Sequence, residues 1–436
     1  MNKQYLKCLL IITVLLGTQL PASAQTNNTT ASLLGSEDVI LQWNRVLMGT
    51  IRTPGQQPPT IFPVRSFAMM HAAMFDAVNS IDGSYTPYFT DEPVSQNASL
   101  QAAAAQAAHD VLAALYPSRL AIFDAELGIS LDGIAERRAR QGIRVGQVVA
   151  ARLVAHRAND GWNATPAAYV LPLTAGNWQP TPTAFAAAGF THFPAVLPFA
   201  ITSNTQFSPN PPPALTSAEY ASAFNEVKEI GSAISATRTA DQTLVAQLWA
   251  NVNTPTTVFF VWNNVASAVA ISRNNTIVEN ARLFALMNIA FHDALQTTFT
   301  SKFAHGLWRP VTAIRRAEED GNPNTAPDVN WSSLIGNPPY PTYAGNHAAI
   351  GTSQATILAL FFGRDDIRFD HTWEGAGGAT RSYSGFMAMA NEEERSRVYG
   401  GIHFTFDQTA GQSAGRNVAN YVFLNIMKPR CKPLAN

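Results

Sequence analysis

The sequence has almost no cysteine. Only Cys8 and Cys431 occur among its 436 residues. Cys8 lies in an apparent leader, described below, which leaves one cysteine, and one cysteine cannot form an internal disulfide. No HExxH segment or cysteine pair of the kind that holds zinc occurs either. We therefore expect a fold that relies on packing alone.

Charge is also scarce. Charged residues make up 14% of the sequence, against about 25% in an average soluble domain, and the net charge is −1. There is no basic field of the kind that binds nucleic acid, and no basic amphipathic segment suited to a membrane surface. Any chemistry must come from a few local polar clusters.

Long apolar runs are missing as well. The first 24 residues have the form of a secretory signal peptide: the lysines of MNKQYLK, a short apolar run, and the cleavage pattern Ala22-Ser23-Ala24. That run is too short to span a membrane, and no later stretch reaches about 18 uninterrupted apolar residues. We expect an exported protein, periplasmic or extracellular, without a membrane span.

What the sequence does contain is helical periodicity. Apolar residues recur three and four positions apart in most segments, and clean alternation of strand type is hard to find. This pattern predicts an all-α protein, with helices over 39–51, 64–81, 98–116 and 131–158 and several more after residue 216. Between about 160 and 215 prolines crowd in and the periodicity stops, which indicates a long extended connection.

An internal repeat suggests two helical halves. FAMMHAAMFDA (67–77) matches FALMNIAFHDA (284–294) at six positions, including Asp76 and Asp293. Two alanine-rich helices can agree by chance, but an aspartate in an apolar helix is costly without a partner. The alternative is two bundles of related design. We predict an N-terminal bundle over 25–200, which ends in the proline-rich linker, and a C-terminal half over 201–436.

Polar residues gather in RSRVYGGIHFTFD, residues 395–407. His403 and Asp407 are four apart, so they share a face if the segment is helical, and the carboxylate can hold one imidazole nitrogen. Gly400-Gly401 would end a helix and let Arg397 converge on His403. Taken alone, such a group is more often a surface network than a site.

Two further stretches strengthen the case for a site. In KFAHGLWRP, Lys302 and Arg309 are seven apart, which predicts one helix face, and the following proline predicts the end of that helix. In PPYPTYAGNHA, His347 precedes an apolar helix whose N-terminal N–H groups can seat an anion. Three cations could neutralise an oxyanion there. One imidazole could attack or ligate its central atom while the other moves protons.

The order of these segments resembles the three-part signature of one superfamily. It unites vanadium-dependent haloperoxidases, type 2 phosphatidic acid phosphatases and bacterial non-specific acid phosphatases. The first part, residues 302–310, and the third part, residues 396–407, match in full. The similarity looks closest to the soluble, exported bacterial haloperoxidase-like branch. Its members are all-helical with two four-helix bundles, so the resemblance implies that architecture here.

The resemblance also implies roles for the residues. Lys302, Arg309 and Arg397 would clamp vanadate as the cofactor, or a phosphate. His403 would be bonded to vanadium, or would be the nucleophile that becomes phosphohistidine in a phosphatase. Asp407 would orient His403. The acid/base would be His347.

The middle part, residues 344–347, departs from the superfamily. The usual Pro-Ser-Gly-His is here Ala344-Gly345-Asn346-His347. The serine hydroxyl that would contact an equatorial oxygen is missing at Gly345, which argues against efficient chloride oxidation. Asn346 tolerates left-handed backbone angles, and its amide is a candidate replacement for the lost donor. Because the backbone N–H groups remain, Gly345 and Asn346 are both counted as oxyanion-binding residues.

Three functions stay open. The first is a haloperoxidase that oxidises halide with hydrogen peroxide. The second is a secreted acid phosphatase that acts on a phosphate ester through a phosphohistidine, and the third is a non-catalytic helical protein with a relict anion pocket. Asp76 and the pair His292-Asp293 are candidates to brace the clamp arginines, and Tyr340 and Phe299 to line a substrate pocket. The remaining histidines are expected to be packed or solvated.

Overall fold

The computed structural model describes residues 38–57, 61–250, 258–373 and 378–430. The predicted signal peptide and both cysteines lie outside the described residues. Helices dominate, which confirms the all-α class. The helices are α1 (Val39–Arg52), α2 (Phe62–Asp82), α3 (Leu100–Leu115), α4 (Leu120–Leu131), α5 (Glu136–His156), α6 (Ala218–Ile230), α7 (Ala240–Ala250), α8 (Val258–Ser272), α9 (Ile277–His305), α10 (Pro310–Arg315), α11 (Asn346–Phe362), α12 (Phe386–Tyr399) and α13 (Thr405–Asn425).

Two local predictions were wrong. The helix expected over 131–158 starts only at Glu136, because Gly133 adopts φ +72° after α4 and breaks the chain direction. A β-hairpin was also missed. Strands β1 (Phe369–Trp373) and β2 (Ala379–Tyr383) pair antiparallel between α11 and α12. Only His371, Trp373 and Tyr383 of the ten strand residues are buried, so no sustained apolar alternation marked it.

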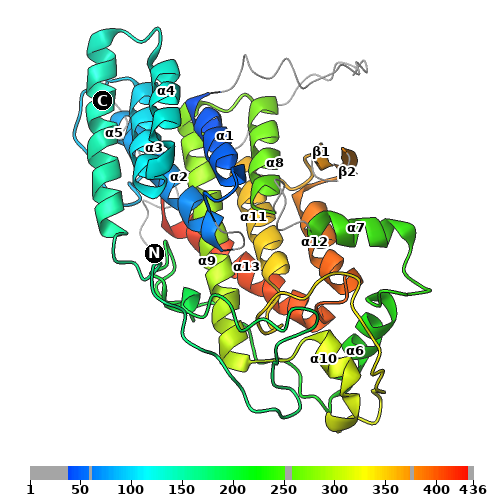
Figure 1. Ribbon diagram of the computed structural model, residues 1–436. Coiled ribbons are helices and arrows are strands. Elements are labelled where there is room, and N and C mark those ends of the chain that lie inside the picture. Colours follow the sequence, from blue (N-terminus) through cyan, green and yellow to red (C-terminus); the bar gives the residue numbers. More distant parts are fainter. Residues whose placement is uncertain (1–37, 58–60, 251–257, 374–377, 431–436) are drawn as a thin grey trace, which may run out of the picture.

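The helices form two bundles that meet along α9 (Figure 1). Helices α1 to α5 make one bundle, and α8, α9, α11, α12 and α13 make the other. The long helix α9 contacts α2 on one side and α11 and α13 on the other. Between α5 and α6 the only regular element among the described residues is the 3₁₀ turn Phe193–Ala195. The division of the chain near residue 200 stays a prediction.

The internal repeat extends beyond the two matching segments. In the first bundle, Asn44 Oδ1 of α1 lies 3.0 Å from His71 Nε2 of α2. In the second, Asn263 of α8 and Asn288 of α9 exchange amide hydrogen bonds of 3.2 and 3.1 Å. Each asparagine follows a buried tryptophan, as Trp43-Asn44 and Trp262-Asn263. The two helix pairs therefore share both packing and polar contacts.

The repeated aspartates have matching partners. Each carboxylate accepts three consecutive backbone N–H groups from a bend in a loop. Asp76 accepts from residues 88–90 and Asp293 from residues 199–201, all at 2.7 to 3.0 Å. Both aspartates are buried. The expectation that they brace the clamp arginines was wrong, because these carboxylates fix the course of a loop in each half.

A third correspondence lies in the remaining helices. Gly142 and Gly146 of α5 face α3, and Gly411 and Gly415 of α13 face α11. At each of these glycines a Cβ would collide with the backbone of the facing helix. Small residues four apart thus let both helix pairs approach closely, and the same design occurs twice. Among the described residues no helix combines the length and the hydropathy needed to cross a membrane.

Candidate active site

The three motif segments converge at one end of the second bundle. Lys302 lies in the last turn of α9, whereas Arg309 is the N-cap residue of α10, so the expectation of one shared helix face was wrong. Gly306 (φ +57°) ends α9, and Pro310 begins α10 as its first residue, where its missing N–H costs nothing. The chain turns between the two cations, and both side chains enter the same buried region.

All three clamp residues are buried. Lys302 and Arg309 are fully buried and Arg397 is 5% exposed. Lys302 Nζ donates to the carbonyl oxygens of Thr342 (2.7 Å) and Ala344 (2.5 Å). Arg309 donates from Nε to the Tyr340 carbonyl at 2.9 Å. These bonds tie the loop before α11 to the ends of α9 and α10.

Arg397 comes from α12, which ends just before Gly400-Gly401. Gly401 adopts φ +77°, a left-handed conformation that lets the chain reverse toward α13. Arg397 Nη1 donates to the Trp249 carbonyl at 3.0 Å, while its buried Nε has no hydrogen-bond partner among the described residues. Arg397 therefore has one unused N–H donor, and its side chain also lines the cavity described below.

His403 is held in a defined tautomer. Its Nδ1 lies 2.9 Å from Asp407 Oδ2 and 3.0 Å from Thr342 Oγ1, and its Nε2 lies 3.1 Å from Arg309 Nη1. Because Arg309 can only donate, Nε2 must accept, and the ring proton belongs on Nδ1. His403 precedes α13 rather than belonging to it, so Asp407 reaches it from the first turn of that helix. The lone pair on Nε2 is the one that could attack or ligate an anion.

Burial and mutual repulsion shift the charges of this cluster. The pKa of Lys302 is held well below its ordinary value by burial and then by the charge of Arg309. Burial lowers the pKa of Arg309 and that of Arg397 to about 10, so both remain cations at neutral pH. Burial and the clamp charges also keep the pKa of His403 well below normal. An anion placed here would relieve the repulsion among the cations.

His347 approaches the site from the first turn of α11. Its Nδ1 lies 3.1 Å from Glu393 Oε1, and Glu393 Oε2 accepts the Trp262 indole N–H at 2.8 Å. These two atoms form no hydrogen bond with each other, so the Glu393 carboxyl is a close neighbour of the ring only. Burial, then the charges of Arg397 and Lys302, lowers the pKa of His347 well below normal. Burial raises the pKa of Glu393 well above its usual range.

Sequence reasoning missed Glu393 and Thr342. Glu393 is fully buried one helical turn before Arg397 on α12, and that spacing of four residues was the available signal. It was hidden because Glu393 belongs to the run NEEER, which resembles a solvated helix face. Thr342 donates its hydroxyl to Asp407, and nothing in its neighbourhood in the sequence marked it.

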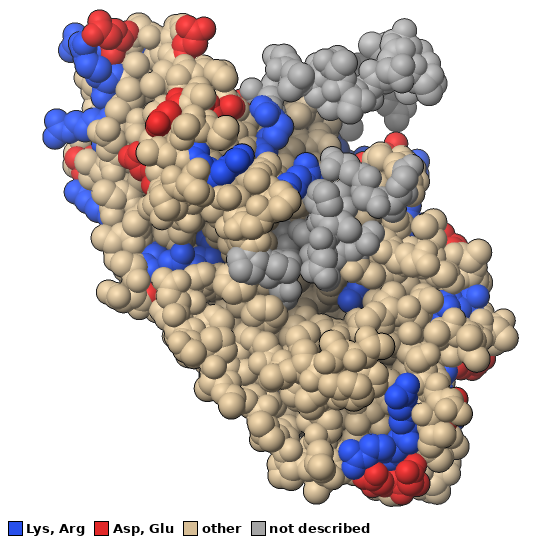
Figure 2. Space-filling view, viewed as in Figure 1, with Lys and Arg blue, Asp and Glu red and all other residues tan. Residues whose placement is uncertain are grey.

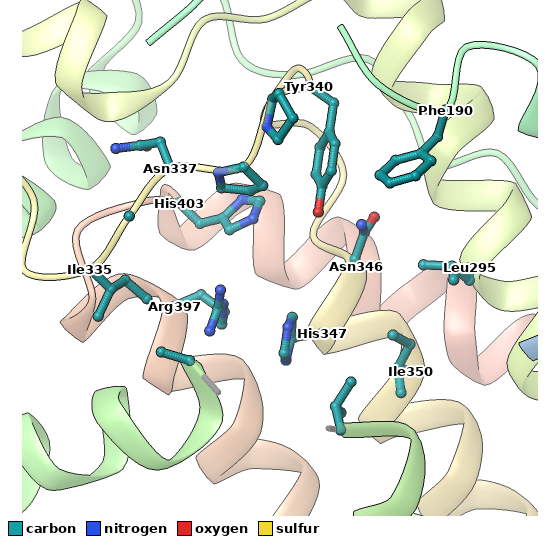
Figure 3. A pocket seen from close by; sticks show the side chains of 15 residues that line it. Phe190, Leu295, Ile335, Asn337, Tyr340, Asn346, His347, Ile350, Arg397 and His403 are labelled. Atoms are coloured by element: carbon teal, nitrogen blue, oxygen red, sulfur yellow. The ribbon is translucent and has the colours of Figure 1, made fainter. Parts of the chain in front are cut away.

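The middle part needs no left-handed residue. Gly345 has φ −72° as the N-cap of α11, and Asn346 is the first helical residue, so the conformational argument for Asn346 was wrong. Asn346 Oδ1 accepts the Thr298 hydroxyl proton at 2.8 Å. The amide of Asn346 also forms a hydrogen bond with the Tyr340 hydroxyl, which points toward Asn346 in Figure 3. The role of Asn346 as an oxyanion donor stays a prediction.

A cavity of about 500 Å³ opens over these groups. Its polar wall is formed by Asn346, His347, Arg397 and His403, which point into a common space in Figure 3. The rest is largely apolar and includes Phe190, Val258, Leu295, Ile335, Tyr340 and Ile350. Phe299 is fully buried and packs against Tyr340 with ring centroids 5.0 Å apart, so it supports the wall from behind.

Elsewhere the charges are dispersed. Figure 2 shows Lys, Arg, Asp and Glu side chains scattered over the visible face, without a basic field. The remaining histidines lie away from the cavity wall; His71, for example, contacts Asn44, and His109 contacts Asp110 and Asp124. Within the described residues, the buried clamp is thus set apart from the scattered surface charge.

Comparisons with known proteins bear on this geometry. Residues 282–430 match the family described as the second helical-bundle domain of VCPO. Vanadium chloroperoxidase from Curvularia inaequalis is 25% identical over 191 residues, which is 37% of this chain and 30% of that protein. The resemblance to the vanadium haloperoxidase superfamily is confirmed. The match spans less than a third of the Curvularia protein, so it does not extend to that protein's whole activity.

Solved haloperoxidases share the fold over most of the chain. The first bacterial vanadium-dependent iodoperoxidase superposes with a TM-score of 0.76 at 22% identity, covering 94% of this chain and 100% of the other. A holo-type bacterial vanadium-dependent chloroperoxidase gives 0.65 at 17% identity, covering 82% and 90%. At these identities the likeness establishes the haloperoxidase fold, and the reaction must be argued from the site.

Proposed function

We propose that this protein is a vanadate-dependent haloperoxidase that oxidises a halide with hydrogen peroxide. The observation that carries the proposal is the state of His403. Its Nδ1 is held by Asp407 and its Nε2 presents a lone pair beside Arg309, within a buried group of three cations. Such a centre suits an anion whose central atom accepts a nitrogen ligand.

Vanadate fits the residues present. Lys302, Arg309 and Arg397 would hold its oxygens, and His403 Nε2 would bind the metal. The unused Nε donor of Arg397 is a further group that an oxyanion would satisfy. When bound, vanadate supplies the Lewis acid that activates peroxide for attack by halide.

The side chains supply orientation and proton transfer. Asp407 and Thr342 fix the His403 ring so that Nε2 faces the anion. The lowered pKa of His347 leaves it neutral at pH 7, ready to accept a proton from peroxide and to return one to a leaving oxygen. The remainder of the cavity wall is largely apolar and would reduce the polarity around the reacting groups.

The test is a reconstitution assay. Protein freed of oxyanions is incubated with orthovanadate and assayed for peroxide-dependent oxidation of iodide, bromide and chloride, with His403→Ala as the matched control. We expect vanadate to restore activity in the parent and not in His403→Ala. Hydrolysis of a phosphate ester that vanadate inhibits would instead indicate the phosphatase, and neither activity would indicate a relict pocket. Equal halide oxidation by His403→Ala would refute the role of His403.

Export is part of the proposal. The first 24 residues support it through their signal-peptide pattern. Cell fractionation of an expressing bacterium, with the N-terminus of the recovered protein sequenced, would show whether cleavage follows Ala24. Recovery of the uncleaved chain from the cytoplasm would contradict export.

A further inference from the structure

Gln408 is a buried amide that nothing in the site has yet explained. It follows Asp407 in the first turn of α13 and is 1% exposed. Neither its Oε1 nor its Nε2 has a hydrogen-bond partner among the described residues. Leaving such a group unpaired costs about 1–3 kcal/mol, and native proteins contain few of them. Two unpaired atoms on one side chain therefore point to a ligand.

The amide lies at the N-terminus of α11. A Cβ at Gly345 would lie 2.7 Å from Gln408 Oε1 and 2.9 Å from Gln408 Nε2. Gly345 is the N-cap of α11, makes no side-chain cap, and donates its own N–H to the Asp407 carbonyl at 2.8 Å. A side chain at position 345 would therefore displace the amide of Gln408 from this place.

The chain neighbours of both residues belong to the site. The preceding residue, Ala344, accepts from Lys302 Nζ, and the residue before Gln408 is the one that orients His403. The first N–H groups of α11 also face outward from its N-terminus, where they favour negative charge. An amide here has two N–H donors for an oxyanion, and its oxygen can turn toward helix N–H groups.

We propose that Gln408 is a further oxyanion-binding residue, which donates from Nε2 to a tetrahedral anion held between the clamp and the N-terminus of α11. The inference rests on the proposed function only in that the site binds such an anion. Either vanadate or phosphate offers the required acceptors, so the prediction concerns binding and does not depend on turnover.

The experiment is calorimetric titration of the full-length protein with inorganic phosphate and, separately, with orthovanadate. Gln408→Met keeps the size of the side chain but removes the N–H donor. It should lower the affinity for each anion by roughly 10- to 100-fold, the effect of losing a hydrogen bond to a charged group. Gln408→Glu places a carboxylate there and should weaken binding further. Gln412→Met is the matched control on α13. The Gln412 amide donates to Asn391 outside the site, so the Gln412→Met variant should bind each anion with the affinity of the parent.

A double variant separates donation from folding. Gly345→Ser alone should weaken binding, because the new side chain collides with the Gln408 amide. Combined with Gln408→Ala, the serine hydroxyl can take the vacated place, so the pair should bind more tightly than Gln408→Ala alone. Thermal melting of each variant identifies unfolded protein.

The outcomes separate the two proposals. Parent-like affinity in folded Gln408→Met would overturn the role of Gln408 and leave the proposed function standing. If Gln408→Met does not fold, parent-like affinity in Gln408→Glu would overturn that role in the same way. Failure of the parent to bind either anion would overturn both. Normal binding without halide oxidation would overturn the haloperoxidase alone.

Discussion

Replacing Asp407 with alanine is expected to weaken oxyanion binding by about 10- to 100-fold, the usual effect of removing the group that orients a metal-binding histidine. In the structure, Asp407 Oδ2 accepts from His403 Nδ1 (2.9 Å), from the Phe404 N–H (3.0 Å) and from the Thr342 hydroxyl. Without it, the His403 proton is no longer held on Nδ1, and the tautomer with an unprotonated Nε2, the one that can accept from Arg309, becomes less populated.

The same replacement should lower the free energy of unfolding. Three donors lose a buried charged acceptor at once, and breaking such a group typically costs about 3–5 kcal/mol. Asp407→Asn should cost less, because its oxygen can keep the position of Oδ2 while its nitrogen takes that of Oδ1, which has no partner among the described residues. Thr342→Val, which removes one hydroxyl and leaves the His403–Asp407 contact, is the matched control.

Two measurements decide this prediction. Calorimetric titration with vanadate gives the affinity, and nitrogen NMR of labelled histidine reports which ring nitrogen of His403 carries the proton. We expect Asp407→Ala to lose both affinity and the Nδ1–H tautomer, and Thr342→Val to keep most of each. If Asp407→Ala bound vanadate as tightly as the parent, the argument from the tautomer would be refuted.

Three more predictions follow from the same geometry. Glu393→Gln should lower kcat about 10-fold or more, because it replaces the carboxyl group whose Oε1 lies 3.1 Å from His347 Nδ1. Steady-state kinetics with parent-like kcat would contradict this. Phosphate binding should be accompanied by proton uptake, because a bound anion raises the pKa values of His347 and Lys302, which burial and neighbouring cations lower in the free protein. Phosphate affinity should therefore rise as the pH falls from the pKa values of the bound state to those of the free state. Calorimetry in buffers of different ionisation enthalpy, corrected for the ionisation of phosphate, would show no proton uptake if this is wrong. Asp293→Ala and Asp76→Ala should each lower the free energy of unfolding in urea by about 3–5 kcal/mol, because in each case three backbone N–H groups lose a buried carboxylate. A decrease below about 1 kcal/mol in either variant would contradict the equivalence of the two loops.

The parts of the site that the sequence predicted are those carried by fixed spacing. Lys302, Arg309, Arg397 and His403 stand in an ordered motif, and the structure brings them together. The geometry assigned to them was less accurate. Lys302 and Arg309 were placed on one helix, but a left-handed Gly306 separates their elements. Spacing alone cannot distinguish two turns of helix from a helix, a turn and a second helix start.

Contacts between distant segments could not be predicted in the same way. Glu393 meets His347 from a position 46 residues away, and Gln408 fills the volume left by Gly345 from 63 residues away. Each depends on how α12 or α13 packs against α11. The repeat was different, because Asp76 and Asp293 were recognisable in the sequence, although their loop partners were not. Local pattern therefore predicted the elements, and tertiary packing determined their partners.

The most direct test of the account is a crystal structure of the protein soaked with orthovanadate. The account predicts one vanadate per chain, with its metal bonded to His403 Nε2 and its oxygens within hydrogen-bond distance of Lys302, Arg309 and Arg397. Vanadate bound elsewhere, or a clamp that keeps its carbonyl contacts with no anion among the three cations, would contradict it.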